Sequence, residues 1–204
     1  MKRFTAISAT AVAAALFLAG CGSDTGSNTT EESTGMDHSI MSHSPAPAAS
    51  DAGGTHNSAD AMFAQMMIPH HEQAAQMSDI MLAKDDLDPQ ITRLAENIKA
   101  AQAPEIEKMT GWLQTWDEQM EMSGDHVMEG MLSSDDLAEL EASLGAEASR
   151  LFLTQMIEHH EGAIAMAEEE AANGQDPDAV ALAETIVADQ KAEIEKMNNL
   201  LAAI

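Results

Sequence analysis

An internal duplication constrains the fold of this chain more than any other feature of its sequence. Residues 63–77 read FAQMMIPHHEQAAQM, and residues 152–166 read FLTQMIEHHEGAIAM. Phe, Met, Ile, the His-His-Glu triplet, Ala and the final Met recur in register, 89 positions apart. A second motif follows each copy, IKAAQAPEIEKM at 98–109 and IVADQKAEIEKM at 186–197. The chain is therefore a duplicated two-helix unit, and its shared residues include metal-ligand types.

Apolar residues in the first unit recur at steps of three and four, which is the spacing of one face of an α-helix. Ser58 is predicted to cap the first helix, which extends to about Ala83. The pair Asp88-Pro89 combines a capping side chain with a first-turn proline and so predicts a second helix, ending near Trp116.

The second unit carries equivalent signals. Ser133 or Ser134 is predicted to cap a short helix over residues 135–144, which Gly145 ends. A long helix then extends to a stop at Gly174, and Asp176-Pro177 begins the last helix.

A single amphipathic hairpin cannot bury its own apolar face, so the two hairpins are expected to pack on each other. The predicted fold is all-α, an antiparallel four-helix bundle made of two duplicated helical hairpins. It covers residues 58–204, with the first hairpin at 58–119, a Met-rich loop at 120–133 and the second hairpin at 134–204.

The N-terminal region is expected to be a targeting segment and a tether. Residues 1–20 combine two basic residues with an apolar stretch too short to span a bilayer, as in a signal peptide. The sequence Leu-Ala-Gly before Cys21 resembles a bacterial lipobox, which implies that Cys21 is lipidated. The alternative is an ordinary signal peptide or a short anchor. Residues 21–57 are rich in Ser, Thr, Gly, Ala and Pro, which is typical of a flexible tether.

The charge of the chain excludes several partners. Cleavage of the signal would leave 9 − 2 = 7 basic residues against 35 acidic ones, a formal net charge of −28. Such a chain repels nucleic acid and anionic headgroups, so membrane attachment must come from the lipid on Cys21. Most of these carboxylates are expected to form a solvated surface.

The helical register of each hairpin predicts a shared layer of polar and thioether side chains. Helical spacing directs His70 and His159 inward, with His71 and His160 to the side. The alternative for an inward histidine is a satisfied core residue. The candidate ligands of the bundle are Met67, His70, His71, Met156, His159 and His160, with Gln102, Glu105, Gln190 and Glu193 at the levels of these residues on the neighbouring helices.

Two further Met/His clusters lie where no core explains them. One is in the tether and the other in the loop between the units, and the alternative for the tether cluster is chance composition. The candidate ligands are Met36, His38, Met41 and His43 in the tether, and Met120, Met122, His126, Met128 and Met131 in the loop.

The ligand types indicate the metal. Thioethers favour Cu(I), and imidazole serves Cu(I) and Cu(II), so copper is predicted with Cu(I) preferred. Zinc has no need for Met. A di-iron bundle needs Glu-x-x-His motifs, and this chain has none.

The repeated motif Phe-x-x-x-Met-Ile-x-His-His-x-x-Ala-x-x-Met, followed by Gln-x-x-Glu-Ile-x-x-Met, resembles the bacterial domain-of-unknown-function family 305 (DUF305) over about residues 58–204. The resemblance implies a ferritin-like fold and, as in some members, extracytoplasmic copper binding. It also implies the same six bundle ligands at Met67, His70, His71, Met156, His159 and His160.

The leading hypothesis is a lipid-anchored extracytoplasmic protein that sequesters, buffers or transfers copper without catalysis. One alternative is a metal-dependent bundle oxidoreductase, and another is a non-metal interaction domain whose His and Met residues only pack. A homodimer and an unidentified copper-transfer partner are compatible with the sequence, which leaves storage and delivery open.

Overall fold

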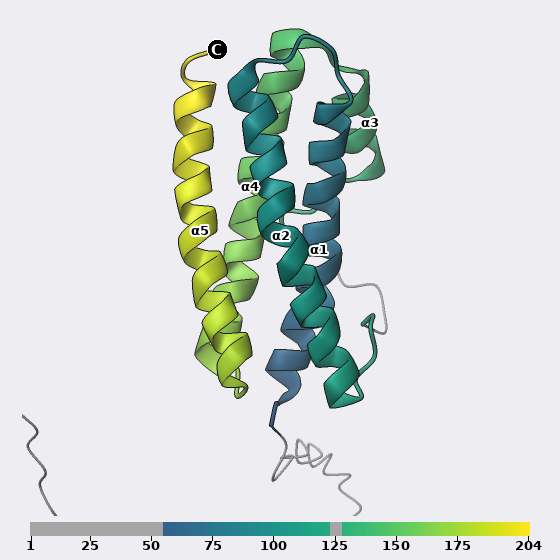
Figure 1. The fold of residues 1–204 in the computed structure, drawn as a ribbon, viewed down its shortest axis with the longest axis vertical. Helices are drawn as coiled ribbons and strands as arrows, with labels where there is room; N and C mark the ends of the chain where they lie inside the picture. The colour runs from purple at the N-terminus through teal and green to yellow at the C-terminus, as the bar shows by residue number, and fades with distance from the viewer. Residues whose placement is uncertain (1–54, 123–127) are drawn as a thin grey trace, which may run out of the picture. The chain divides into compact units, whose positions relative to one another are not determined.

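The structure is a computed structural model, and it describes residues 55–122 and 128–204. These residues form four long helices and one short helix (Figure 1). The helices are α1 (Ser58–Leu82), α2 (Pro89–Trp116), α3 (Ser134–Ala142), α4 (Gly145–Asn173) and α5 (Pro177–Leu201).

The long helices form two hairpins, α1 with α2 and α4 with α5, and the hairpins pack mainly through α1 and α4 (Figure 1). Hydrogen bonds at both ends show that α1 and α4 are antiparallel. At one end the Asp60 carboxylate accepts from the backbone of Asp176, and at the other Lys84 donates to the carbonyl of Ser143. The predicted all-α antiparallel four-helix bundle of two duplicated hairpins is therefore confirmed.

The helix start signals are largely confirmed. Asp88 and Asp176 cap α2 and α5, each followed by a first-turn proline, and Ser133 caps α3. The predicted cap of α1 is wrong by one residue. Asn57 accepts from the backbone of Ala59 and Asp60, and the Asp60 carboxylate accepts from the backbone N–H of Asn57. This reciprocal capping box satisfies donors that a Ser58 cap would leave open.

The predicted end of the short helix is also wrong. α3 ends at Ala142, and Gly145 is the first residue of α4 instead of a stop signal. Gly145 has a φ of 57°, which a residue without a Cβ adopts without strain. The glycine therefore provides the sharp turn between α3 and α4.

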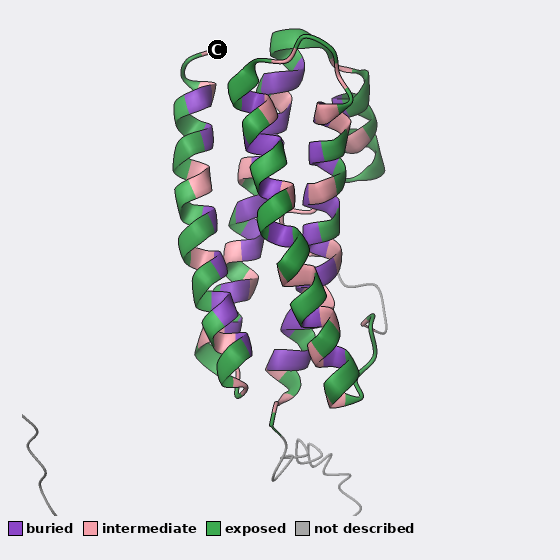
Figure 2. Ribbon diagram, viewed as in Figure 1, coloured by how far each residue is buried: buried purple, intermediate pink, exposed green. Residues whose placement is uncertain are grey.

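Buried residues line the inner faces of the helices (Figure 2), and the apolar ones form two separate clusters. One cluster includes Met77, Leu94, Phe152 and Leu153 at the end of the bundle near α3. The other includes Phe63, Met67, Leu113 and Ile186 at the opposite end. The segments between the clusters carry the buried His and Gln residues, so a polar layer divides the core at its middle.

Several predictions lie outside the described residues. These are the signal peptide at 1–20, the lipidation of Cys21, the tether ligands Met36, His38, Met41 and His43, and His126 in the loop. They stay predictions. Within residues 55–122 and 128–204, no helix is both long enough and apolar enough to cross a membrane.

Candidate metal centre

The polar layer at the middle of the bundle is built from the repeated motifs. α1 and α4 each contribute a His-His pair, and α2 and α5 each contribute a Gln and a Glu three residues later. The members are His70, His71, Gln102, Glu105, His159, His160, Gln190 and Glu193. All four histidines are fully buried. This set, called the His layer below, is the place where the duplicated residues meet.

His70 and His159 face each other across the interface between the hairpins. Their ring centroids lie 3.7 Å apart with an angle of 38° between the ring planes. The rings are therefore in contact, and within the described part of the chain neither ring has a hydrogen-bond partner at Nδ1 or Nε2. Four buried imidazole nitrogens are left without partners at the centre of the molecule.

His71 and His160 flank this pair and make equivalent contacts with the neighbouring helices. The Nε2 atom of His71 lies 2.8 Å from Oε2 of Glu105, and Nε2 of His160 lies 2.7 Å from Oε2 of Glu193. A carboxylate only accepts hydrogen bonds, so each pair places the imidazole proton on Nε2. In neutral imidazole, this leaves the buried Nδ1 atom of both rings with a free lone pair and no partner.

Spacing predicts Met67 level with Glu105 or Ile106 and Met156 level with about Glu193, to within about one helical turn. In the structure His71 and His160 contact these two glutamates, which lies within that margin. Met67 and Met156 are fully buried and belong to the two different apolar clusters. Each methionine therefore borders the His layer from the opposite side.

Burial keeps the central histidines neutral. Burial, followed by the charge of His71, lowers the pKa of His70 from 6.5 to about 3. Burial, followed by the charge of His70, lowers the pKa of His159 to about 2. The Glu129 backbone lies close enough to His70 to oppose part of its shift, but its geometry satisfies neither ring nitrogen. Neutral imidazole is the form that binds metals.

The His layer reduces stability, because each unpartnered buried polar group costs about 1–3 kcal/mol. Gln102 and Gln190 add to this cost, since both are buried and their Oε1 atoms also lack partners. Apolar residues of similar size would pack the same space without this penalty. The duplicated polar residues are therefore not explained by folding alone.

The donor atoms around the His layer limit which metal ion it can bind. Among residues 55–122 and 128–204, no group of three or more His, Cys, Asp or Glu side chains is arranged to hold a metal ion. The arrangement in the His layer is instead two imidazoles in contact, two flanking imidazoles and a thioether on each side. Such nitrogen and sulfur donors suit a soft ion of low coordination number.

Part of the predicted loop covers the His layer along α1 and α4, a position that the sequence pattern did not indicate. Gln73 holds it through two hydrogen bonds with the backbone of Leu132, of 2.7 and 2.9 Å. On the other side Gly130 approaches α4 so closely that a Cβ atom would lie 3.1 Å from the His159 carbonyl oxygen. A Cβ on Gly162 would lie 2.0 Å from the carbonyl oxygen of Glu129. Residues 128–132 are called the crossing segment below.

The loop methionines do not join the His layer. Met120, Met122 and Met128 line a surface pocket together with Met66 of α1, while Met131 is half-buried in the crossing segment. Met66 is not among the ligands predicted from the sequence. Helical spacing could not predict that Met66 lies near the loop methionines, because the loop has no periodic structure.

A buried carboxyl pair was also missed. Asp60 of α1 and Glu170 of α4 are both buried. Burial opposes ionisation of Asp60, but hydrogen bonds from the backbone N–H groups of Asn57, Asp176 and Gln175 and from Glu170 outweigh it and lower its pKa. Burial and then the neighbouring Asp60 raise the pKa of Glu170 to about 8. Neither Glu170 oxygen finds a donor, so a proton on Glu170 is needed for the two carboxyl groups to bond.

The fold and the His layer define a class of protein, an antiparallel bundle of two duplicated hairpins with paired histidines at its centre. The chain belongs to the DUF305 family, described as a domain of unknown function, whose model matches residues 60–201. No curated protein matches the chain.

Solved structures support this assignment. A DUF305 protein from Streptomyces coelicolor is 34% identical with a TM-score of 0.69, over 71% of this chain and 93% of that chain. A DUF305 fragment from Deinococcus radiodurans is 29% identical with a TM-score of 0.66, over 72% and 98%. CopM in its Cu(I)-bound form is 31% identical with a TM-score of 0.60, over 71% and 96%. CopM has also been solved in Cu(II)-bound, silver-bound and apo forms.

Proposed function

We propose that this protein is an extracytoplasmic copper-binding lipoprotein that sequesters, buffers or transfers copper, with Cu(I) as its preferred cargo. The observation that carries the proposal is the pair of buried, neutral and unpartnered imidazoles of His70 and His159. The similarity to CopM, which has been solved with copper and silver, supports the same metal. The N-terminal sequence supports the location, and the name of the relative from Streptomyces coelicolor also describes a secreted protein.

The proposed copper ligands form two groups, the flanking histidines and the central histidines with the two buried methionines. The buried Nδ1 atoms of His71 and His160 are free because the Nε2–H groups of these rings donate to Glu105 and Glu193. A ligating histidine commonly donates its other N–H to a carboxylate, which orients the ring and raises its basicity. His70, His159, Met67 and Met156 complete the donor set around the same centre. Because the rings of His70 and His159 touch, copper uptake requires these rings to turn.

The tether and the loop extend this function. Met36, His38, Met41 and His43 would capture copper before it reaches the bundle, and His126 and Met131 would do so from the loop. No residue of the proposed site is needed as an acid, base or nucleophile, so binding without catalysis is the simplest role.

The test is an anaerobic Cu(I) competition titration of the full chain against a chromogenic chelator. We expect the variant His70→Ala/His71→Ala/His159→Ala/His160→Ala to lose the tightest site. Because these substitutions create cavities, a second variant keeps the packing. Glu105→Gln/Glu193→Gln should weaken binding by about 10–100-fold through loss of the carboxylate partners.

The repeat offers a matched control, Glu107→Gln/Glu195→Gln, which removes the same two charges from exposed positions of the same motif. The control should bind like the unmodified chain. Tight and equal affinity in all variants would assign the copper to the tether or the loop instead of the His layer. Affinity no tighter than that of free Met and His peptides would favour the interaction domain. Turnover of a copper-dependent reaction above that of free copper would favour the oxidoreductase.

A further inference from the structure

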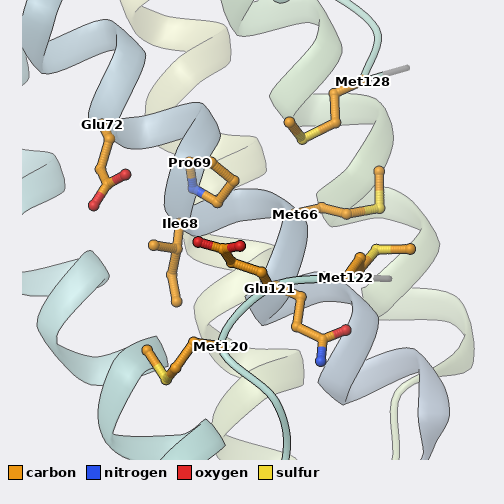
Figure 3. Close-up of a pocket in the computed structure, with 9 residues that line it drawn as sticks. Met66, Ile68, Pro69, Glu72, Met120, Glu121, Met122 and Met128 are labelled. Atoms are coloured by element: carbon orange, nitrogen blue, oxygen red, sulfur yellow. The ribbon is translucent and has the colours of Figure 1, made fainter. Parts of the chain in front are cut away.

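A pocket on the surface of the bundle gathers methionines from two distant segments. It has a volume of about 300 Å³ and lies between α1 and the loop that follows α2. Met66 lines it from α1, and Met120, Met122 and Met128 line it from the loop. In Figure 3 the side chains of Met66, Met122 and Met128 gather on one side of the pocket, and Met120 lies on the other near Ile68.

Core packing does not account for these side chains. Met120 is 42% exposed, and Met66, Met122 and Met128 are only half-buried. None of the four belongs to either apolar cluster, although Met67, the next residue in α1, is fully buried in one of them. Thioethers placed around an open pocket are accessible to an ion in a way that the core methionines are not.

The charges around the pocket favour cations. Among residues 55–122 and 128–204, its lining includes Glu72 and Glu121 and no Lys, Arg or His, in a chain with a formal net charge of −26. The carboxylates raise the local concentration of any cation without selecting one. The thioethers then select, because soft sulfur donors bind Cu(I) and its relatives and do not bind hard cations.

We propose that this pocket is a separate binding site for a soft monovalent cation, Cu(I) or Ag(I), held by the thioethers of Met66, Met122 and Met128. The site goes beyond the function proposed for the His layer, because it shares no ligand with that layer and does not require it to bind metal. Pro69, which also lines the pocket, precedes His70 in α1. The pocket therefore lies on the outer side of the same helical turn that carries the buried histidines.

The test uses the full chain labelled with ¹³C at the methionine methyl groups, titrated with Ag(I), which is soft and does not change oxidation state. The methyl resonances are assigned through single Met→Leu variants. We expect the methyl signals of Met66, Met122 and Met128 to shift together along one saturation curve. Zn(II) added at the same concentration should leave these three signals in place, because the proposed ligands are thioethers.

Two double variants separate binding from packing. Met66→Leu/Met122→Leu keeps apolar volume but removes two of the three proposed ligands. Because tethered donors act at high effective concentration, the shift of the Met128 signal should then need roughly a hundredfold more Ag(I). Met62→Leu/Met166→Leu removes two thioethers that line a second pocket on the other side of Met66, outside the proposed ligand set, and should leave the curve unchanged.

The outcome does not depend on the His layer. If Ag(I) moves the pocket methyls while the signals of Met67 and Met156 stay fixed, the pocket proposal holds and the function proposed for the His layer fails. If only Met67 and Met156 respond, the pocket proposal is wrong. The proposal would also be overturned if both double variants needed the same Ag(I) concentration to shift the Met128 signal, because Met66 and Met122 would then contribute no more to binding than Met62 and Met166.

Discussion

Glu170→Gln should remove a loss of stability that the wild-type chain shows as the pH rises. Glu170 is 1% exposed, beside the fully buried Asp60. Burial, the hydrogen bond with Asp60 and the charges of Asp60 and Asp176 raise the pKa of Glu170 from 4.5 to about 8. The substituted amide would mimic the protonated form of the carboxyl group at every pH.

The sign follows from proton binding. Between the two pKa values the folded chain holds a proton on Glu170 that the unfolded chain has released, so the free energy of unfolding falls as the pH rises. The limit is about 1.4 kcal/mol per pH unit, or about 2.7 kcal/mol from about pH 5.5 to about pH 7.5. Glu170 also borders an open pocket that water can enter. Screening by this water should reduce the loss to about 1–1.5 kcal/mol.

The assay is urea unfolding followed by circular dichroism at a series of pH values. The quantity of interest is the difference in free energy of unfolding between the wild type and Glu170→Gln, because other groups titrate equally in both. Glu169→Gln is the matched control, since it removes the same charge from an exposed neighbour. A difference that stays constant across this pH range would refute the argument, because Glu170 would then ionise in its usual range.

Three further predictions concern the central histidines, the crossing segment and α2. The pKa values of His70 and His159 are depressed in the folded chain, so the stability of the Glu170→Gln variant should decline as the pH falls from about 6.5 toward about 3, as measured by the same urea series. Gly130→Ala should destabilise the fold by about 1–3 kcal/mol, because Gly130 has a φ of 81° and an added Cβ would lie 2.6 Å from a backbone oxygen. Gly111→Ala, at an open position of α2, should stabilise it by about 0.5–1 kcal/mol in thermal unfolding, and a loss at both glycines would contradict the steric account.

The fold was predictable because local and global signals agree. Asp88-Pro89 and Asp176-Pro177 mark the same step in both units, and the repeat requires two equivalent hairpins. The predictions that were wrong concern single residues at the ends of helices. The cap of α1 moved to Asn57 because Asp60 could complete a capping box, and Gly145 opened α4 because a left-handed residue serves a turn between helices as well as a helix end.

The candidate site was predictable in composition and not in geometry. The repeat identifies the His-His pairs, and their neighbours on α2 and α5 follow from hairpin spacing to within one turn. Spacing along one hairpin cannot show that His70 meets His159, because that contact depends on how the two hairpins pack. The pair of Asp60 and Glu170 was missed for the same reason, since 110 residues separate them in the sequence.

The positions at which the two copies of the repeat differ carry information that the shared positions do not. Gln73 and Gly162 occupy the same place after the His-His-Glu triplet, and the crossing segment contacts both. Gln73 supplies hydrogen bonds to the backbone of this segment, and Gly162 supplies the space for it. If the two halves were identical, their contacts with the crossing segment would be equivalent.

This difference between the two halves therefore determines which sides of the His layer are covered and which are close to solvent. Along α1 and α4 the crossing segment covers the layer. On α2 and α5 the side chains of Glu105 and Glu193 are 17% and 23% exposed while they hold buried histidines. These two carboxylates thus connect the buried Nε2–H groups of His71 and His160 to the surface. The methionine-lined pocket lies beside α1, where the crossing segment begins at Met128. Copper would then approach the His layer from a different side than the one on which Glu105 and Glu193 lie, so displacement of the crossing segment should alter metal uptake without disturbing the His–Glu pairs.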